Sequence, residues 1–218
     1  MNLLHAIYEP AGSGPHPAII AIHGWGANAL DLLGLSPYLG ADFMVLCPQG
    51  SLHLGAGAPL GYGWFPIGSG SPPDPGEFER AVDALREFVR EAVRRYPIDT
   101  LKLVVLGFSQ GGVMAYSLAL AEPERFAAMV CLSTWLPPNL TDRLAAADRS
   151  RLPTLVHHGV ADPMIPVDRG RESVETLRRL GVPVTYREFD MAHEINGPSL
   201  TDLSRWLREK VLSPIILA

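Results

Sequence analysis

Residues 103–112 read Leu-Val-Val-Leu-Gly-Phe-Ser-Gln-Gly-Gly, an apolar run that leads directly into a Gly-x-Ser-x-Gly motif centred on Ser109. The following residues, 110–121, are mostly small and apolar and predict a helix. A strand, this motif and a helix in that order are typical of a nucleophile elbow, a sharp turn that exposes the serine hydroxyl. Gly107 and Gly111 suit such a turn because they have no Cβ to clash. The other interpretation is a glycine-rich turn in which Ser109 has no chemical role.

Short apolar segments and helical segments alternate along the 218 residues. Strands are expected at residues 3–8, 18–22, 43–47, 101–106, 127–132, 154–157 and 184–189. Several are continuously apolar, as in parallel strands covered on both faces. Helices are expected at residues 77–95, 110–121, 168–180 and 199–211, the last with Ser199 as a cap-like first residue. The pattern predicts one α/β domain over residues 1–218, with a mostly parallel sheet and right-handed crossovers.

Composition and charge argue against a nucleic-acid-binding protein and against a membrane-spanning one. The net charge is −5 and no basic block occurs, which argues against a nucleic-acid partner. Cys47 and Cys131 fall in predicted strands and are expected to be buried and inert. No apolar run is long enough to span a membrane, and no secretory signal precedes the first strand, so a cytoplasmic location is expected.

A serine nucleophile needs a histidine base and an acid that orients it. After a nucleophile elbow these follow in the chain order acid, then histidine. Asp162 lies just beyond the predicted strand 154–157, and His193 lies in the loop after strand 184–189. Asp190 is the competing acid, although only three residues separate it from His193. His157 and His158 precede Asp162 and are expected to have backbone partners instead.

The reaction also needs two N–H donors for a developing oxyanion. The elbow supplies the backbone N–H of Gln110. The second is expected from Trp25, in the glycine-rich segment after strand 18–22, where the alternative is an ordinary turn with a packed tryptophan. Asp31, a few residues later, is expected to cap the next helix.

The segment from residue 50 to residue 76 breaks the alternation of strands and helices. It is rich in Gly and Pro yet too apolar for simple disorder. We expect it to lie over the carboxyl edge of the sheet, near the substrate.

Taken together, these motifs resemble the phospholipase/carboxylesterase family of the α/β-hydrolase fold. The matching segments are HGWG at residues 23–26, WF at 64–65, GFSQGG at 107–112, HGVADPMIP at 158–166 and MAHEI at 191–195. The resemblance implies helices on both faces of the sheet and no large cap domain. It also implies Ser109 as nucleophile, His193 as base, Asp162 as orienting acid, and Trp25 and Gln110 as oxyanion donors. Relatives often have an acid after the Trp-Phe pair, where this chain has Pro66.

The activity implied by the resemblance is hydrolysis of short to medium acyl esters, or of thioesters, without a metal or cofactor. The alternatives are an acyl-protein thioesterase or lysophospholipase, a dienelactone-hydrolase-like lactonase, and a non-catalytic binding protein of the same fold. The apolar tail, residues 214–218, is open to interpretation as a core segment, a homodimer contact or a lipid contact. Candidate residues of an apolar acyl pocket are Trp25, Leu54, Trp64, Phe65, Trp135 and Leu136.

Overall fold

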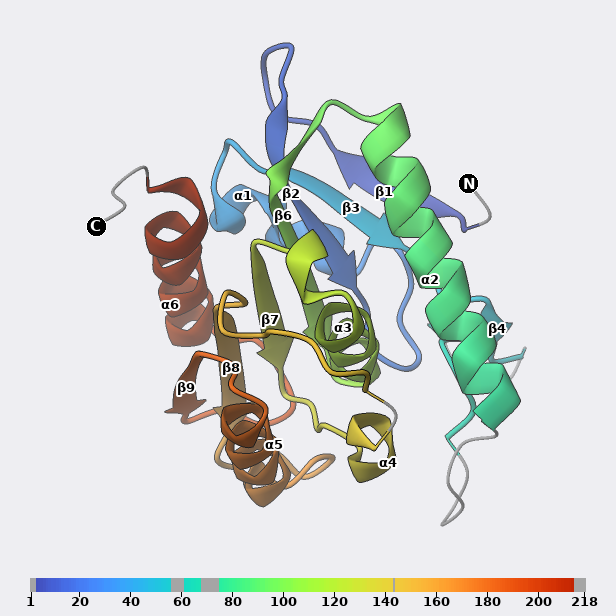
Figure 1. Cartoon of the computed structure of the whole chain (residues 1–218), viewed down its shortest axis with the longest axis vertical. Coiled ribbons are helices and arrows are strands. Elements are labelled where there is room, and N and C mark those ends of the chain that lie inside the picture. Colours follow the sequence, from blue (N-terminus) through green and yellow to red (C-terminus); the bar gives the residue numbers. More distant parts are fainter. Residues whose placement is uncertain (1–2, 56–60, 68–74, 143, 214–218) are drawn as a thin grey trace.

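Seven strands form one sheet in the order β1-β3-β2-β6-β7-β8-β9 in the computed structural model, which describes residues 3–55, 61–67, 75–142 and 144–213 (Figure 1). Strand β1 pairs antiparallel with β3, and every other pairing in this sheet is parallel. This is the mostly parallel sheet of the α/β-hydrolase fold, as predicted. The strands are β1 (His5–Tyr8), β2 (His16–Ile22), β3 (Met44–Pro48), β6 (Ile98–Phe108), β7 (Ala128–Leu132), β8 (Thr154–Gly159) and β9 (Val184–Phe189).

Helices cover both faces of the sheet. Core residues of α2, α3 and α5 pack on one face, and those of α1 and α6 pack on the other (Figure 1). The helices are α1 (Ser36–Leu39), α2 (Pro75–Arg95), α3 (Gln110–Ala121), α4 (Pro138–Thr141), α5 (Val167–Arg179) and α6 (Gly197–Leu207). Short 3-10 turns occupy η1 (Leu32–Leu35) and η2 (Pro123–Arg125), and a π-helical turn, η3 (Arg208–Leu212), continues α6.

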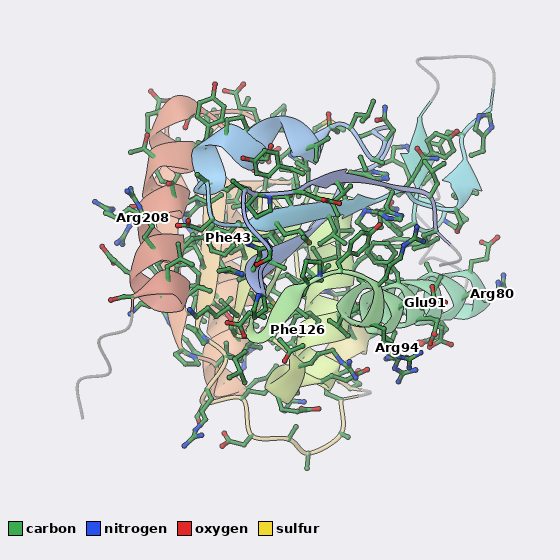
Figure 2. The ribbon with its side chains drawn as sticks, turned by 90° about the horizontal axis from the view of Figure 1, so that it is seen from above. Phe43, Arg80, Glu91, Arg94, Phe126 and Arg208 are labelled. Carbon is green, nitrogen blue, oxygen red and sulfur yellow. The ribbon has the colours of Figure 1, made fainter. Side chains whose placement is uncertain are left out.

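The continuous apolar runs follow from this layering. Successive side chains of a strand point to opposite faces, so a strand covered on both faces needs apolar residues at every position. In β2, Ile20 and Ile22 join the core beneath α2 and α3, whereas Ile19 joins the core beneath α1 and α6. Figure 2 shows Phe43 inside the fold, in the core beneath α1 and α6, and Arg208 pointing outward.

The start of α6 differs from the expectation. The N-cap is Asn196, whose Oδ1 accepts a hydrogen bond from the Ser199 N–H at 3.0 Å, and the helix begins at Gly197. Ser199 was expected at this cap, and that prediction is wrong. Its side chain is fully buried and is turned toward the sheet instead.

The described part of the segment 50–76 lies over the carboxyl edge of the sheet. Strands β4 (Leu52–His53) and β5 (Tyr62–Gly63) form a small antiparallel pair. Tyr62 exchanges backbone hydrogen bonds with the loop after β2, through Gly26 N–H at 2.9 Å and Ala27 O at 2.8 Å. The segment therefore lies against the loop that carries Trp25.

Two regions named by the sequence analysis fall partly or wholly outside the described residues. Residues 56–60 and 68–74 of the segment 50–76 are among these, as is the apolar tail 214–218. Of the helices that the structure does describe, none combines the length and the apolar character needed to cross a bilayer.

A buried polar cluster joins β8 to α6. His157 is fully buried, with Nδ1 3.0 Å from Ser199 Oγ and Nε2 3.1 Å from Asp202 Oδ2. Asp202 also pairs with Arg205 and lies 3.6 Å from Nε of Arg187. The expectation of a backbone partner for His157 is therefore wrong, because its ring meets side chains of α6. Burial lowers the pKa of His157 to about 4.

This lowered pKa predicts a stability that depends on pH. The folded protein keeps His157 neutral, whereas an unfolded histidine takes up a proton below its ordinary pKa of 6.5. The contribution is therefore complete above pH 6.5 and is lost as the pH falls toward 4. Between pH 7 and pH 5 we expect the wild type to lose about 2 kcal/mol more unfolding free energy than His157→Gln. Urea unfolding of both proteins at both pH values measures these free energies. Equal losses in the wild type and in His157→Gln would contradict the prediction.

Candidate active site

Ser109 lies in a strained turn between β6 and α3. Its backbone has φ 53° and ψ −122°, a conformation that L-residues rarely adopt. Hydrogen bonds on both sides hold the turn: Ser109 N–H donates to Leu132 O at 2.9 Å, and the Thr134 hydroxyl donates to Ser109 O at 2.7 Å. A Cβ on Gly111 would overlap the Ile22 carbonyl, so glycine is required at this position. The local geometry is that of a nucleophile elbow.

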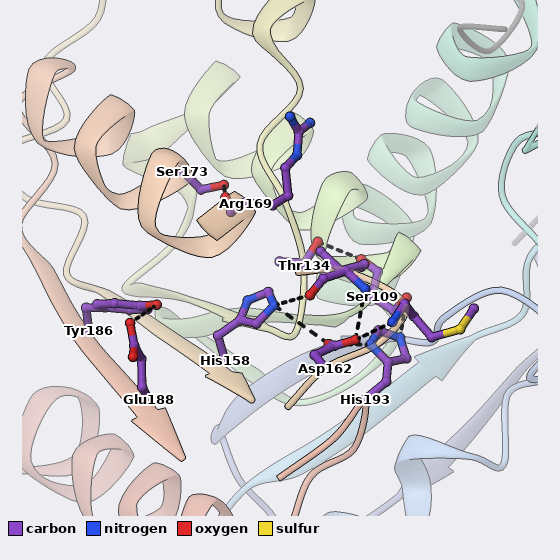
Figure 3. A network of polar contacts seen from close by, with 11 residues as sticks. Ser109, Thr134, His158, Asp162, Arg169, Ser173, Tyr186, Glu188 and His193 are labelled. Atoms are coloured by element: carbon purple, nitrogen blue, oxygen red, sulfur yellow. Dashed lines mark hydrogen bonds and ion pairs between the residues drawn. The ribbon is translucent and has the colours of Figure 1, made fainter. Parts of the chain in front are cut away.

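A continuous chain of hydrogen bonds connects Ser109, His193 and Asp162 (Figure 3). His193 Nε2 lies 2.9 Å from Ser109 Oγ, and His193 Nδ1 lies 2.7 Å from Asp162 Oδ2. A carboxylate only accepts, so Nδ1 carries the proton and Nε2 presents its lone pair to the serine hydroxyl. The three residues come from the ends of β6, β8 and β9, and the side chain of Asp162 is fully buried. Asp190, the competing acid, is exposed.

Two backbone N–H groups close to Ser109 in the fold are candidates for binding an oxyanion. Gln110 is the first residue of α3, and its N–H makes no hydrogen bond within the described residues. The same holds for the N–H of Trp25. Gly24 brings the Trp25 segment close, since a Cβ at Gly24 would lie 3.1 Å from the Cβ of Ser109. These are the donors that the sequence suggested.

The Gln110 side chain has a separate task, which the sequence analysis missed. Its Oε1 accepts the Trp64 N–H at 2.9 Å, and its Nε2 donates to Phe65 O at 2.7 Å. Trp64 in turn donates its indole N–H to His23 O at 2.9 Å. Gln110 therefore fastens the Trp-Phe segment to the elbow.

His23 holds the loop after β2 in place through hydrogen bonds of its buried ring. The ring is buried, with Nδ1 2.7 Å from Gly24 O and Nε2 3.0 Å from the Gly50 N–H. A carbonyl accepts and an amide donates, so Nδ1 carries the single proton. Burial lowers the pKa of His23 and favours this neutral form. His23 thus joins the loop that carries Trp25 to the loop after β3.

His158 is a further residue whose importance the sequence analysis missed. It is fully buried at the end of β8, and its Nε2 donates to the Ile165 carbonyl at 2.8 Å, a backbone partner as expected. Ile165 belongs to the turn that follows Asp162. Its backbone N–H donates to Asp162 Oδ1 at 2.9 Å, and the N–H of Met164 donates to the same oxygen at 2.8 Å. His158 Nε2 also lies 3.7 Å from Asp162 Oδ2 (Figure 3). His158 therefore closes the turn that holds the carboxylate in place.

The structure contains two hollows that bear on the candidate site. One, of about 530 Å³, is lined by both Ser109 and His193 and by the exposed Trp25. The other is an apolar cavity of about 480 Å³ between α2, α3 and α4, with Phe65 and Trp135 in its wall.

Three candidate pocket residues line neither hollow. Trp64 and Leu136 are buried, and Leu54 is half-buried. Within the described residues, His, Cys, Asp and Glu form no group of three that could hold a metal ion.

The role of His158 is open to test by a matched pair of variants. His158→Gln keeps an N–H donor near the position of Nε2, whereas His158→Leu removes it and leaves the Ile165 carbonyl unpaired. We expect labelling of Ser109 by a fluorophosphonate to slow about tenfold or more in the leucine variant, and much less in the glutamine variant. Second-order labelling rates, measured on protein shown to be folded by circular dichroism, decide this. Equal rates in the two variants would show that the donor is unimportant.

Comparison with known proteins identifies the family of the chain. The family model described as Phospholipase/Carboxylesterase matches residues 5–211. A relative named Acyl-protein thioesterase 1 from Gibberella zeae is 32% identical over 114 residues, 50% of this chain and 48% of the relative. A "Probable carboxylesterase SOBER1-like" from Arabidopsis thaliana is 26% identical over 158 residues, 69% of this chain and 60% of the relative. These matches span only about half to three fifths of the relatives' lengths.

Solved structures extend the likeness in fold over nearly the whole chain. The Bacillus cereus carboxylesterase superposes with a TM-score of 0.83 at 22% identity, covering 96% of this chain and 95% of that one. Esterase PE8 also gives a TM-score of 0.83, at 26% identity, covering 96% of this chain and all of the other. With its family model matched from residue 5 to residue 211, the chain belongs to the phospholipase/carboxylesterase family.

Proposed function

We propose that the protein is a serine carboxylesterase that hydrolyses short to medium acyl esters through an acyl-enzyme on Ser109. The observation that supports this most is the hydrogen-bond chain from Ser109 Oγ through His193 to Asp162, with distances of 2.9 and 2.7 Å. A serine hydroxyl is a weak nucleophile, and a histidine in this arrangement is the usual means of activating it.

In the acylation step, Ser109 Oγ forms a bond to the ester carbonyl carbon while its proton passes to His193 Nε2. The negative charge that develops on the carbonyl oxygen is stabilised by the N–H groups of Trp25 and Gln110. The bond from carbon to the leaving oxygen then breaks, and His193 Nε2 gives its proton to that oxygen. Asp162 keeps the imidazole in the required tautomer and stabilises the imidazolium.

In the deacylation step, water takes the place of the alcohol. His193 removes a proton from water as its oxygen attacks the acyl carbon, and the same proton returns to Ser109 Oγ when the acid leaves. Ser109, His193 and Asp162 are then restored to their starting states, so none of these steps calls for a metal or redox group.

We assign the acyl group to the cavity of about 480 Å³. Val113, one helical turn after Ser109, lies in its wall near Phe65 and Trp135. Ser117 and Ala121 continue the wall along the same side of α3. At 1.5 Å per residue, the stretch from Val113 to Ala121 is about 12 Å long, which suits a medium-length acyl chain.

An acyl-protein thioesterase or lysophospholipase is the second candidate. It is favoured by the relative named Acyl-protein thioesterase 1, and it would use the same Ser109, His193 and Asp162. A chain-length series of nitrophenyl esters, assayed beside a palmitoyl thioester, separates the two. One domain over residues 1–218 and a cytoplasmic location stay predictions, and the tail stays open to interpretation as a core segment, a homodimer contact or a lipid contact.

The proposed nucleophile can be tested directly. We expect rapid mixing with nitrophenyl butyrate to give a burst of nitrophenol as Ser109 is acylated. If turnover is slow, the acyl-enzyme accumulates, and mass spectrometry should find the acyl group on Ser109. Ser109→Ala should lower kcat/KM by at least a thousandfold, because the nucleophile is lost. Normal turnover by this variant would exclude Ser109 as the nucleophile and with it the proposed mechanism.

The acyl cavity gives a prediction about chain length. Ser117→Leu places a larger apolar side chain midway along the cavity wall and should shorten the longest acyl chain that fits. We expect kcat/KM for nitrophenyl dodecanoate to fall at least tenfold relative to nitrophenyl butyrate. Leu101→Ser, on the exposed start of β6, is a control that should leave this ratio unchanged. An unaltered ratio in Ser117→Leu would place the acyl chain elsewhere.

A further inference from the structure

The hollow beside Ser109 is suited to the part of the substrate that leaves first. In the proposed mechanism His193 Nε2 must protonate the leaving oxygen, so the alcohol has to lie within hydrogen-bond reach of that atom. His193 and Ser109 both line the hollow of about 530 Å³, whereas neither lines the apolar cavity. The alcohol part of an ester therefore falls in the hollow when the acyl part occupies the cavity.

The side chains that line this hollow include an acidic group and aromatic rings. Its described lining comes from the loop after β2, including Trp25 and Asp31, together with Phe108, Ser109 and His193. Trp25 and Phe108 supply aromatic surface, and Asp31 is the one carboxylate in the described lining, which contains no lysine or arginine. An alcohol bound here therefore meets negative charge and aromatic surface, and His193 is cationic only while it holds the proton taken from Ser109.

No hydrogen bond or ion pair among the described residues accounts for the Asp31 carboxylate. Asp31 precedes η1, yet its side chain makes no capping hydrogen bond, so the expectation that it caps this helix is wrong. Within the described residues, the carboxylate has no hydrogen-bond or ion-pair partner, and the residue is exposed. The charge is therefore available to a bound molecule.

The aromatic groups and the loop that carries Asp31 are held in place. Trp25 packs against Gly63, where a Cβ would lie 2.6 Å from its Cε3, and Trp25 is still 39% exposed. The ring of Phe108 packs against that of His193, with 4.9 Å between centroids. Asn28 Oδ1 accepts the Leu30 N–H at 2.8 Å, and Asn28 O accepts the Asp31 N–H at 3.2 Å. The hollow is thus preformed.

We propose that this hollow is a subsite for a cationic leaving group, so that the enzyme prefers esters whose alcohol carries a quaternary or protonated amine. The inference rests on the proposed esterase function and adds the substrate class of its alcohol side. A cation gains from the Asp31 carboxylate through Coulomb attraction and from the Trp25 indole through its π face. A neutral alcohol of equal size fills the same space without either gain.

The test compares butyrylcholine with 3,3-dimethylbutyl butyrate, which replaces the trimethylammonium group by an uncharged tert-butyl group of similar shape. Acid release in a pH-stat gives kcat/KM for both esters. We expect the wild type to favour the choline ester, and Asp31→Asn to lower the ratio of the two values about three- to tenfold. Asp42→Asn removes the same charge from the loop before β3, at the opposite edge of the sheet, and should leave the ratio unchanged.

Salt provides a second measurement that needs no variant. Raising ionic strength screens the Asp31 charge at an exposed site, so the wild-type ratio should fall between 0.01 M and 1 M salt. The proposal is overturned if Asp31→Asn keeps the wild-type ratio, if Asp42→Asn lowers it equally, or if salt has no effect. Hydrolysis of neither ester, with no labelling of Ser109, would overturn the esterase function together with the subsite.

Discussion

The close packing of glycines under Ser109 is the constraint on which the site depends. A serine with φ near 53° is held in a conformation that costs on the order of 1–3 kcal/mol. Gly111 fits against the Ile22 carbonyl only because it has no side chain, and Gly107 packs equally closely against Gly111. This contact joins the start of α3 to β2 and β6 at once. The same glycine contacts therefore set the hydroxyl of Ser109, the N–H of Gln110 and the nearby loop that carries Trp25.

The sequence predicted correctly the strands and helices whose own residues form an apolar run or a helical pattern. The predicted strand at 184–189 and the predicted helix at 110–121 coincide with β9 and α3. Strand β6 begins at Ile98, three residues before the expected start at residue 101. The sequence did not reveal this extension because Asp99 and Thr100 interrupt the apolar run. The hairpin of β4 and β5 has only two residues in each strand, too few for a periodic pattern to develop.

The roles of His157 and His158 could not be separated in advance. Adjacent residues of a strand point to opposite faces, so the two rings meet different layers of the protein. His157 finds Ser199 and Asp202, more than 40 positions later in the chain. His158 finds the turn that carries Asp162. Both sets of contacts exist only after the sheet has closed, which is why a pattern of neighbouring residues does not reveal them.

The same alternation separates the two sides of the proposed substrate. The apolar cavity is walled by Val82 and Val113, which belong to the core beneath α2 and α3. The hollow at Ser109 is walled by Phe108, which packs against the core of α1 and α6. Ser109 lies at the edge between these layers, so an ester bound there would place its acyl and alcohol parts over opposite faces of the sheet. The segment of Gly63, Trp64 and Phe65 joins the two walls, because Phe65 lines the cavity and Gly63 packs against Trp25 in the hollow.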